Sequence, residues 1–161
     1  MNPVTSFSGT AHRQTGLDTP AFPPGRPAPT HGRYHRPGEP WPLYASLEPA
    51  TAWAEWKAST NGAIDPADER RRLWRIDVRD LAVIDLRRPG LADELGISER
   101  QLTGPRSRAH GLAARARELG AEALIVPSAA RADAWNLVVF PSGFGRLRAA
   151  GSRAMHPRPP A

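Results

Sequence analysis

Apolar residues gather in short runs that are separated by polar segments rich in Gly and Pro. The run at residues 73–78 alternates apolar and polar positions, which is typical of a strand with one buried face. The other runs are short and bounded by turn residues, which also favours strands over helices. The sequence therefore predicts strands at Leu43–Ala45, Leu73–Val78, Leu81–Leu86, Ala123–Pro127 and Asn136–Phe140.

Fewer segments have the spacing of an amphipathic helix. The clearest, Ser107–Leu119, carries an apolar stripe and ends at Gly120, a residue favoured just beyond helix ends. A second helix is expected at Thr51–Thr60, with start signals at Ser46 or Pro49, and a short one near residues 91–95. Strands outnumber helices and do not alternate with them regularly. The predicted fold is therefore α+β, a single compact domain with a mixed sheet and few helices.

The two ends of the chain differ from the body in composition. Residues 1–10 are expected to be disordered, and residues 151–161 to form a Pro-rich flexible tail. The Pro-rich stretch at 20–29 is expected to be an extended surface loop. One domain, residues 11–150, remains between these ends, and no internal repeat divides it.

The charge of the chain suggests partners but does not decide between them. The net charge is +6, yet the sole Lys is Lys57, and the one basic run, Glu69–Arg72, has acidic neighbours. A solvated basic face is favoured over nucleic-acid binding, and an acidic protein partner is a third interpretation. No apolar run approaches the length of a membrane span, and the N-terminus lacks a signal-peptide pattern. The absence of cysteine fits a reducing compartment, so a cytoplasmic location is expected.

Three candidate functional residues lie in the stretch from Gly32 to Trp56. Arg33 follows Gly32 and is either a phosphate clamp or one of many surface arginines. Tyr44, inside an apolar strand, is either a stacking platform or a core residue. Glu55 lies on a mostly apolar helix, where a buried carboxylate needs a partner or a function, although an exposed Glu is the ordinary outcome.

Three further polar residues lie outside that stretch. Ser128 follows a predicted strand, and Asn136 opens the next one; each is a candidate substrate contact or an ordinary turn or strand-entry residue. Arg13 is a candidate anion clamp. The five histidines show no metal-binding spacing, and neither a phosphate-binding Gly-Lys-Ser/Thr loop nor a GxGxxG motif is present. We therefore expect no metal site and no conventional nucleotide-binding fold.

In their order and spacing these residues resemble the RES-domain family. The matching positions are Arg33 in Gly-Arg-Tyr, Glu55 in Ala-Glu-Trp and Ser128 in Val-Pro-Ser-Ala, with Tyr44 before the helix and Arg13 near the start. The family comprises the toxins of bacterial toxin–antitoxin pairs, whose partner is an Xre-type antitoxin. Its members look like compact relatives of ADP-ribosyltransferases and degrade NAD.

The resemblance implies that NAD is a substrate, that no cofactor is needed, and that phosphate or water accepts the ADP-ribose. It implies that Arg33 holds the pyrophosphate or an incoming phosphate and that Tyr44 stacks on nicotinamide. Glu55 would stabilise the ribosyl cation, and Ser128 would bind phosphate or ribose. The alternatives are an idle RES-like module that binds a nucleotide or a protein and, ranked last, a small nucleic-acid-binding protein.

Overall fold

The computed structural model of the chain describes residues 2–105 and 108–160 and contains six strands, four α-helices and two 3₁₀ turns within them. The elements are β1 (Val4–Thr15), β2 (Leu43–Ser46), α1 (Pro49–Ser59), η1 (Pro66–Asp68), β3 (Arg71–Asp85), α2 (Leu91–Glu94), α3 (Glu99–Thr103), α4 (His110–Glu118), β4 (Ala123–Pro127), β5 (Trp135–Val139), η2 (Pro141–Arg146) and β6 (Leu147–Met155). These elements confirm the predicted α+β class.

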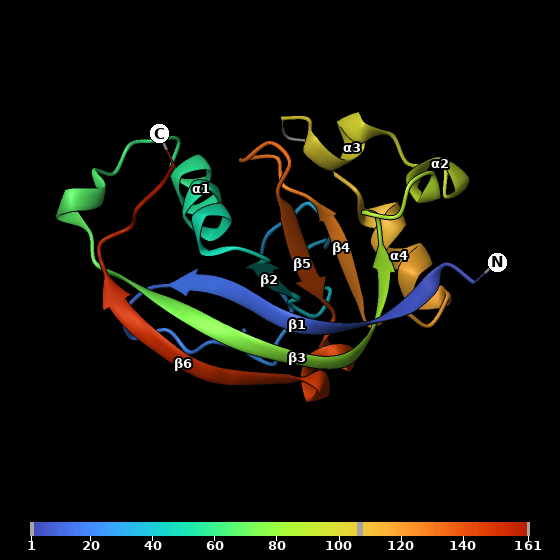
Figure 1. The fold of residues 1–161 in the computed structure, drawn as a ribbon, viewed down its shortest axis with the longest axis horizontal. Helices are drawn as coiled ribbons and strands as arrows, with labels where there is room; N and C mark the ends of the chain where they lie inside the picture. Colours follow the sequence, from blue (N-terminus) through green and yellow to red (C-terminus); the bar gives the residue numbers. More distant parts are fainter. Residues whose placement is uncertain (1, 106–107, 161) are drawn as a thin grey trace.

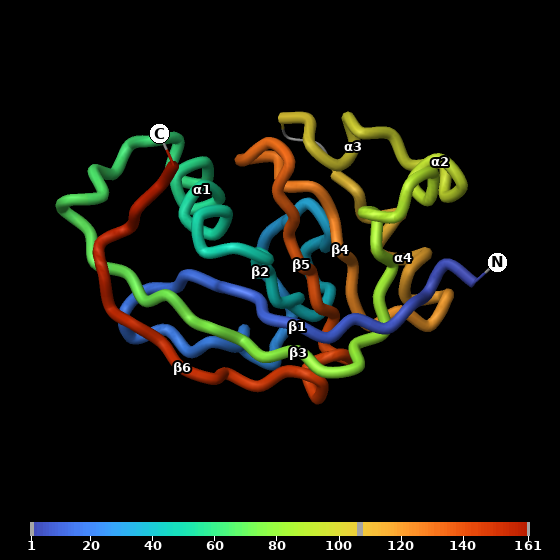
Figure 2. Tube along the Cα trace, viewed as in Figure 1, coloured from blue at the N-terminus to red at the C-terminus, as the bar shows by residue number. Residues whose placement is uncertain are grey.

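The strands form one mixed sheet that closes into a barrel. Their order is β1-β2-β5-β4-β3-β6, and an additional pairing of β1 with β3 closes the ring of five strands. Only β3 and β4 run parallel; the other pairs are antiparallel. In Figure 1, β1, β3 and β6 curve together along one side of the molecule, with α1 above one end and α2, α3 and α4 at the other. Figure 2 shows the N- and C-termini at opposite ends.

The prediction of two separate strands at 73–78 and 81–86 is wrong, because β3 is continuous through both. The residues between them form an irregularity within the strand: Asp80 has φ +50°, and its N–H donates to Ser8 Oγ at 2.9 Å. The pairing with β1 shifts register between Phe7 and Gly9 at the same place. A bulge of this kind bends a strand without ending it.

Both predictions for the chain ends are corrected by the structure. Residues 4–10 belong to β1, where Val4 pairs with Ile84 and Phe7 with Leu81, and residues 151–155 belong to β6. Even His156, beyond β6, places Nδ1 2.8 Å from the carbonyl oxygen of Glu69. Ser, Thr, Gly and Arg dominate these segments, so they carry little apolar signal. They are ordered because β3 supplies hydrogen-bond partners along both of its edges.

The expected helices are found with small shifts at their ends. The helix expected at 51–60 is α1, the short one near 91–95 is α2, and the one expected at 107–119 is α4, which begins at His110; position 107 lies outside the described residues. The short helix α3 was not expected. It begins with a capping box in which Ser98 Oγ accepts from the N–H of Gln101 and the Gln101 side chain accepts from the N–H of Ser98.

Replacing Ser98 with Ala is expected to lower the free energy of unfolding by about 1 kcal/mol, the usual cost of losing such a cap. Urea denaturation of the purified protein measures it. Exposed Ser142, in η2, provides the matched control because its replacement with Ala removes no helix cap. Equal stability of the two variants would show that the capping box does not support α3.

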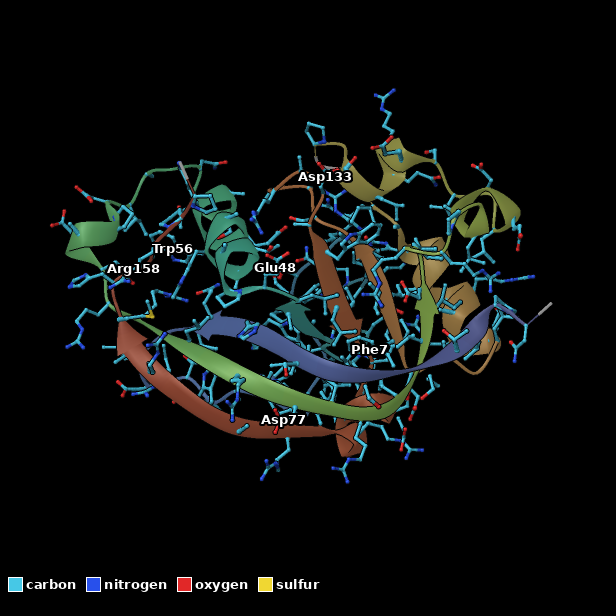
Figure 3. All side chains as sticks on the ribbon, viewed as in Figure 1. Phe7, Glu48, Trp56, Asp77, Asp133 and Arg158 are labelled. Atoms are coloured by element: carbon cyan, nitrogen blue, oxygen red, sulfur yellow. The ribbon has the colours of Figure 1, made fainter. Side chains whose placement is uncertain are left out.

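Two apolar cores hold the elements together. One fills the barrel, and the other lies between the sheet and the helices α2, α3 and α4. Helix α1 packs separately: its Trp53 and Trp56 are buried against Leu73 of β3. In Figure 3, Trp56 lies between α1 and the long strands, in a space that side chains fill. This packing fixes α1 beside β1, β2 and β3.

The basic run at Glu69–Arg72 is used within the fold. Arg71 forms an ion pair with Glu69 at 3.6 Å, and its Nε donates to Gln14 Oε1. Arg72 donates to Ser152 Oγ and lies 6.0 Å from the centre of the Trp74 ring. These contacts engage Arg71 and Arg72 inside the protein. Among the described residues no helix is long and apolar enough to cross a membrane.

Candidate active site

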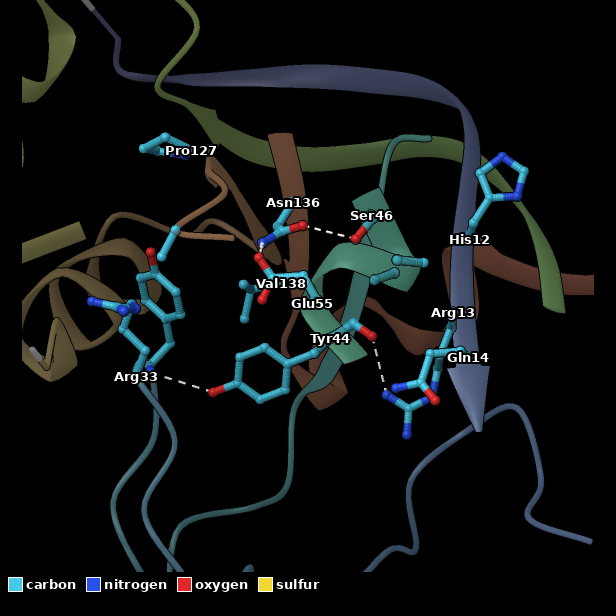
Figure 4. Close-up of a pocket in the computed structure, with 14 residues that line it drawn as sticks. His12, Arg13, Gln14, Arg33, Tyr44, Ser46, Glu55, Pro127, Asn136 and Val138 are labelled. Carbon is cyan, nitrogen blue, oxygen red and sulfur yellow. Dashed lines mark hydrogen bonds between the residues drawn. The ribbon is translucent and has the colours of Figure 1, made fainter. Parts of the chain in front are cut away.

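A cavity of about 320 Å³ lies between α1 and strands β1, β2 and β5. Five of the predicted site residues line it, namely Arg13, Arg33, Tyr44, Glu55 and Asn136, and Figure 4 shows them converging from different elements. Ser128 is not on the lining, but its neighbours Pro127 and Ala129 are, and its hydroxyl bonds directly to Glu55. The structure therefore brings all the predicted site residues together.

The carboxylate of Glu55 is held by two neutral donors. Its Oε1 accepts from Ser128 Oγ at 2.6 Å and from Asn136 Nδ2 at 3.0 Å. Within the described part of the chain, no ion pair joins Glu55 to a cation. The structure thus fixes the direction of the carboxylate without neutralising its charge.

The hydroxyl of Ser128 is fully occupied inside the protein. Besides donating its proton to Glu55, Oγ accepts from the N–H groups of Ala130 and Arg131, each at 3.1 Å. A serine hydroxyl offers one donor and two acceptor positions, and all three are used here. Ser128 therefore reaches a bound molecule through Glu55 and not by a hydrogen bond of its own.

Strand pairing orients the amide of Asn136. Ser46 of β2 is paired with Asn136 of β5, and its Oγ donates to Asn136 Oδ1 at 2.8 Å. Because Oδ1 accepts from Ser46, Nδ2 of the amide faces Glu55, and a chain of hydrogen bonds runs from Ser46 through Asn136 to the carboxylate. Ser46 was not predicted as a site residue. The alternation of side chains along a strand could have found it, because Ser46 and Tyr44 point to the same face of β2.

Tyr44 forms one wall of the cavity, and its hydroxyl is held by contacts with Tyr34 and His35. The N–H of Tyr34 donates to Tyr44 Oη at 3.3 Å, and His35 Nδ1 lies 2.7 Å from the same oxygen. Burial is the main cause that raises the pKa of Tyr44 above its ordinary value, so the phenol stays neutral. Tyr34, which was not predicted as a site residue, also lines the cavity and is buried, and its hydroxyl has no hydrogen-bond partner among the described residues.

Two arginines bring positive charge to the cavity in different ways. Arg13 donates from Nη1 to the carbonyl oxygen of Tyr44 at 3.1 Å, and its buried Nε has no partner in the described structure. Burial lowers the pKa of Arg13, although a guanidinium remains charged at neutral pH. Both terminal nitrogens of Arg33 donate to the carbonyl oxygen of Gly104, just beyond α3. Arg13 therefore has more free hydrogen-bonding capacity for an anion than Arg33.

His12 of β1 is a further lining residue that was not predicted as a site residue. Burial and, to a smaller extent, the charge of Arg75 lower the pKa of His12, which favours the neutral ring.

Among the described residues no group of three or more His, Cys, Asp or Glu side chains is placed to hold a metal ion. The cavity thus offers a directed carboxylate, an aromatic wall and guanidinium groups, a set suited to a ligand with an anionic and a cationic part.

Comparison with known proteins adds three findings. The family model of the RES domain matches residues 10–157. A Mycobacterium tuberculosis protein named "probable NAD(+) phosphorylase" is 32% identical over 158 residues, which are 98% of this chain and 76% of the relative. A chain in the crystal structure of the M. tuberculosis MbcT–MbcA toxin–antitoxin complex superimposes with a TM-score of 0.77 at 26% identity, covering 96% of this chain and 87% of that one.

Proposed function

The chain belongs to the RES-domain family, and on that premise we propose that it is an NAD-degrading enzyme of the toxin type, which cleaves the bond between nicotinamide and ribose. The observation that carries the proposal is the carboxylate of Glu55, directed by Ser128 and Asn136 at the wall of the cavity. A negative charge fixed in this way stabilises positive charge that develops on a substrate.

The bond that breaks joins the ribose C1′ to the ring nitrogen of nicotinamide. Its electron pair goes to that nitrogen, which carries a positive charge in NAD, so nicotinamide leaves as a neutral molecule and needs no general acid. The ribose is left with cationic, oxocarbenium-like character beside Glu55. An oxygen of phosphate or of water then bonds to this carbon, which is numbered C1″ in the product, and gives ADP-ribose 1″-phosphate or, with loss of a proton, ADP-ribose.

The other residues of the cavity have roles that follow from their contacts. Tyr44 provides a neutral aromatic face for the nicotinamide ring, and the guanidinium of Arg13 binds the pyrophosphate or an incoming phosphate. Arg33 adds positive charge from its anchored position beside Gly104. Ser128 and Asn136 act by holding Glu55. No cofactor takes part in this chemistry.

We further propose that the chain is held in check by an antitoxin protein, since a chain of similar fold occurs in a toxin–antitoxin complex. NAD is abundant in the cytoplasm, and the chain contains no cysteine. A cytoplasmic location is therefore part of the proposal. An enzyme that consumes NAD there must be kept inactive until it is needed, which fits control by a tightly bound partner.

The test is to mix the purified, folded chain, free of any partner, with NAD and to follow free nicotinamide by proton NMR. We expect nicotinamide release, and a comparison with and without inorganic phosphate separates phosphorolysis from hydrolysis. The absence of release in both conditions, with folding confirmed by circular dichroism, would overturn the proposal in favour of an idle binding module.

A further inference from the structure

His35 lies behind the cavity and reaches it only through Tyr44. The residue is 5% exposed, Nδ1 lies 2.7 Å from Tyr44 Oη, and the two ring centres are 5.7 Å apart. His35 does not itself line the cavity. The ring of Trp41 also lies near the imidazole, with ring centres 6.4 Å apart. The imidazole is therefore placed to act on the position of Tyr44 and not on a bound molecule.

We assign Tyr44 as the donor in this hydrogen bond, because the surrounding contacts favour that direction. The N–H of Tyr34 already donates to Tyr44 Oη, so the oxygen serves as an acceptor there. The proton of the Tyr44 hydroxyl has Nδ1 of His35 as its acceptor within hydrogen-bond distance. A bare Nδ1 requires the neutral ring that carries its proton on Nε2, a buried atom without a hydrogen-bond partner among the described residues. The neutral form of His35 thus holds the phenol ring in place at the cavity wall.

Protonation of His35 would change the site in two ways. Nδ1 would become a donor, so Tyr44 Oη would receive two N–H groups and its own proton would have to turn away. A positive charge would also appear behind the wall of a cavity in which a cation has to develop, and charges of the same sign repel. Both changes act against the proposed reaction.

The charged and titratable groups around His35 favour different forms of the ring. Burial, the largest cause, lowers the pKa of His35, and the nearby rings of His110 and His31 act in the same direction. The carbonyl of Thr30 and the carboxylate of Glu39 favour the protonated ring. Glu39 is engaged elsewhere, because its Oε2 accepts from Arg117 Nη2 at 3.0 Å. The net result is a pKa below the ordinary value, so His35 is neutral at pH 7.

We propose that His35 is a positioning residue for NAD cleavage, which holds Tyr44 through a hydrogen bond in its neutral form and impairs cleavage when it is protonated. The inference rests on the proposed function, because the reaction supplies its main measurement. The active form is the neutral one. Activity is therefore expected to be complete above the pKa of His35 and to fall as the pH drops through it.

A double-mutant cycle tests the hydrogen bond. We expect His35→Leu and Tyr44→Phe each to lower kcat/KM for nicotinamide release by about ten-fold, the worth of one hydrogen bond. If the two residues act as a pair, kcat/KM of the double variant will be no more than about two-fold lower than that of the less active single variant. Losses that multiply in the double variant would overturn the proposal.

The pH profile separates positioning from a purely structural role. His35→Asn keeps an acceptor oxygen near the position of Nδ1 but cannot be protonated, so we expect kcat/KM within a few-fold of the wild type at neutral pH. We also expect the fall in activity at acid pH to disappear. His156→Asn is the matched control, because His156 lies after β6 against η1, and it should keep both the activity and the acid fall.

A measurement that does not depend on activity completes the test. The imidazole signals are titrated by NMR, and the signal of His35 is identified as the one that is missing in His35→Asn. We expect this signal to show a pKa for His35 below the ordinary value. Tyr44→Phe should change that signal and leave the His156 signal unchanged. An inactive wild type would overturn the proposed function itself. An active wild type whose acid fall persists in His35→Asn would overturn only the role of His35.

Discussion

Replacing Glu55 with Gln is expected to lower kcat for nicotinamide release by roughly 10²–10³-fold and to leave the fold intact. Glu55 Oε1 accepts from Ser128 and Asn136, and the amide oxygen of Gln accepts the same two hydrogen bonds. The geometry of the site is therefore preserved while the negative charge is lost. The charge is needed in the transition state, where the ribose becomes cationic, so the effect should fall on kcat more than on KM.

The measurement is steady-state NAD cleavage followed by proton NMR, with circular dichroism and urea denaturation to confirm folding. Glu118→Gln is the matched control, because the same chemical change at the exposed end of α4 should leave kcat unchanged. Glu55→Ala is a poorer probe, since it leaves the donors of Ser128 and Asn136 without their acceptor and disturbs the site. A folded Glu55→Gln with wild-type kcat would remove Glu55 from the mechanism.

The apolar runs were sufficient to predict the strands in the middle of the chain and the helices α1 and α4. They were not sufficient for β1 and β6. The stability of those strands comes from pairing with β3, and no local pattern reports a partner more than sixty residues away, as Val4 has in Ile84. The continuity of β3 was missed for a related reason. Asp80 looks like a turn residue, and only the bulge opposite Phe7 and Gly9 shows that the strand continues.

The residues predicted from the sequence meet at one cavity, but the contacts that hold them there were not predicted. Residue types and spacing selected Glu55 and Ser128, but only the structure shows that the Ser128 hydroxyl is consumed by Glu55 and two backbone groups. The anchoring of Arg33 could not be predicted, because it depends on the carbonyl oxygen of Gly104, which follows an unexpected helix. His35 was missed because its contact with Tyr44 arises from a loop conformation that has no periodic signature.

Gly32 lies in that loop at a position where a side chain would clash with its neighbours. We therefore expect Gly32→Ala to lower kcat/KM for NAD cleavage by at least about ten-fold. A Cβ at this position would lie 2.3 Å from His35 Nδ1 and 2.6 Å from Tyr44 Oη, far inside van der Waals contact. The buried His35 ring cannot turn aside without breaking its hydrogen bond to Tyr44. Overpacking of this kind typically costs about 1–3 kcal/mol, and here the displaced atoms belong to the cavity wall.

Kinetics and urea denaturation of Gly32→Ala, measured beside Gly111→Ala, make the prediction specific. Gly111 lies in α4, and among the described residues no atom beyond its chain neighbours and the nearby backbone of its own helix lies within 4 Å of the position that its Cβ would take. Ala is the better helix former, so Gly111→Ala should stabilise the protein by roughly 0.5–1 kcal/mol and leave kcat/KM unchanged. The two variants add the same methyl group with opposite expected effects. Full activity in Gly32→Ala would mean that Tyr44 and His35 can move without harm, and that their arrangement is not what the reaction requires.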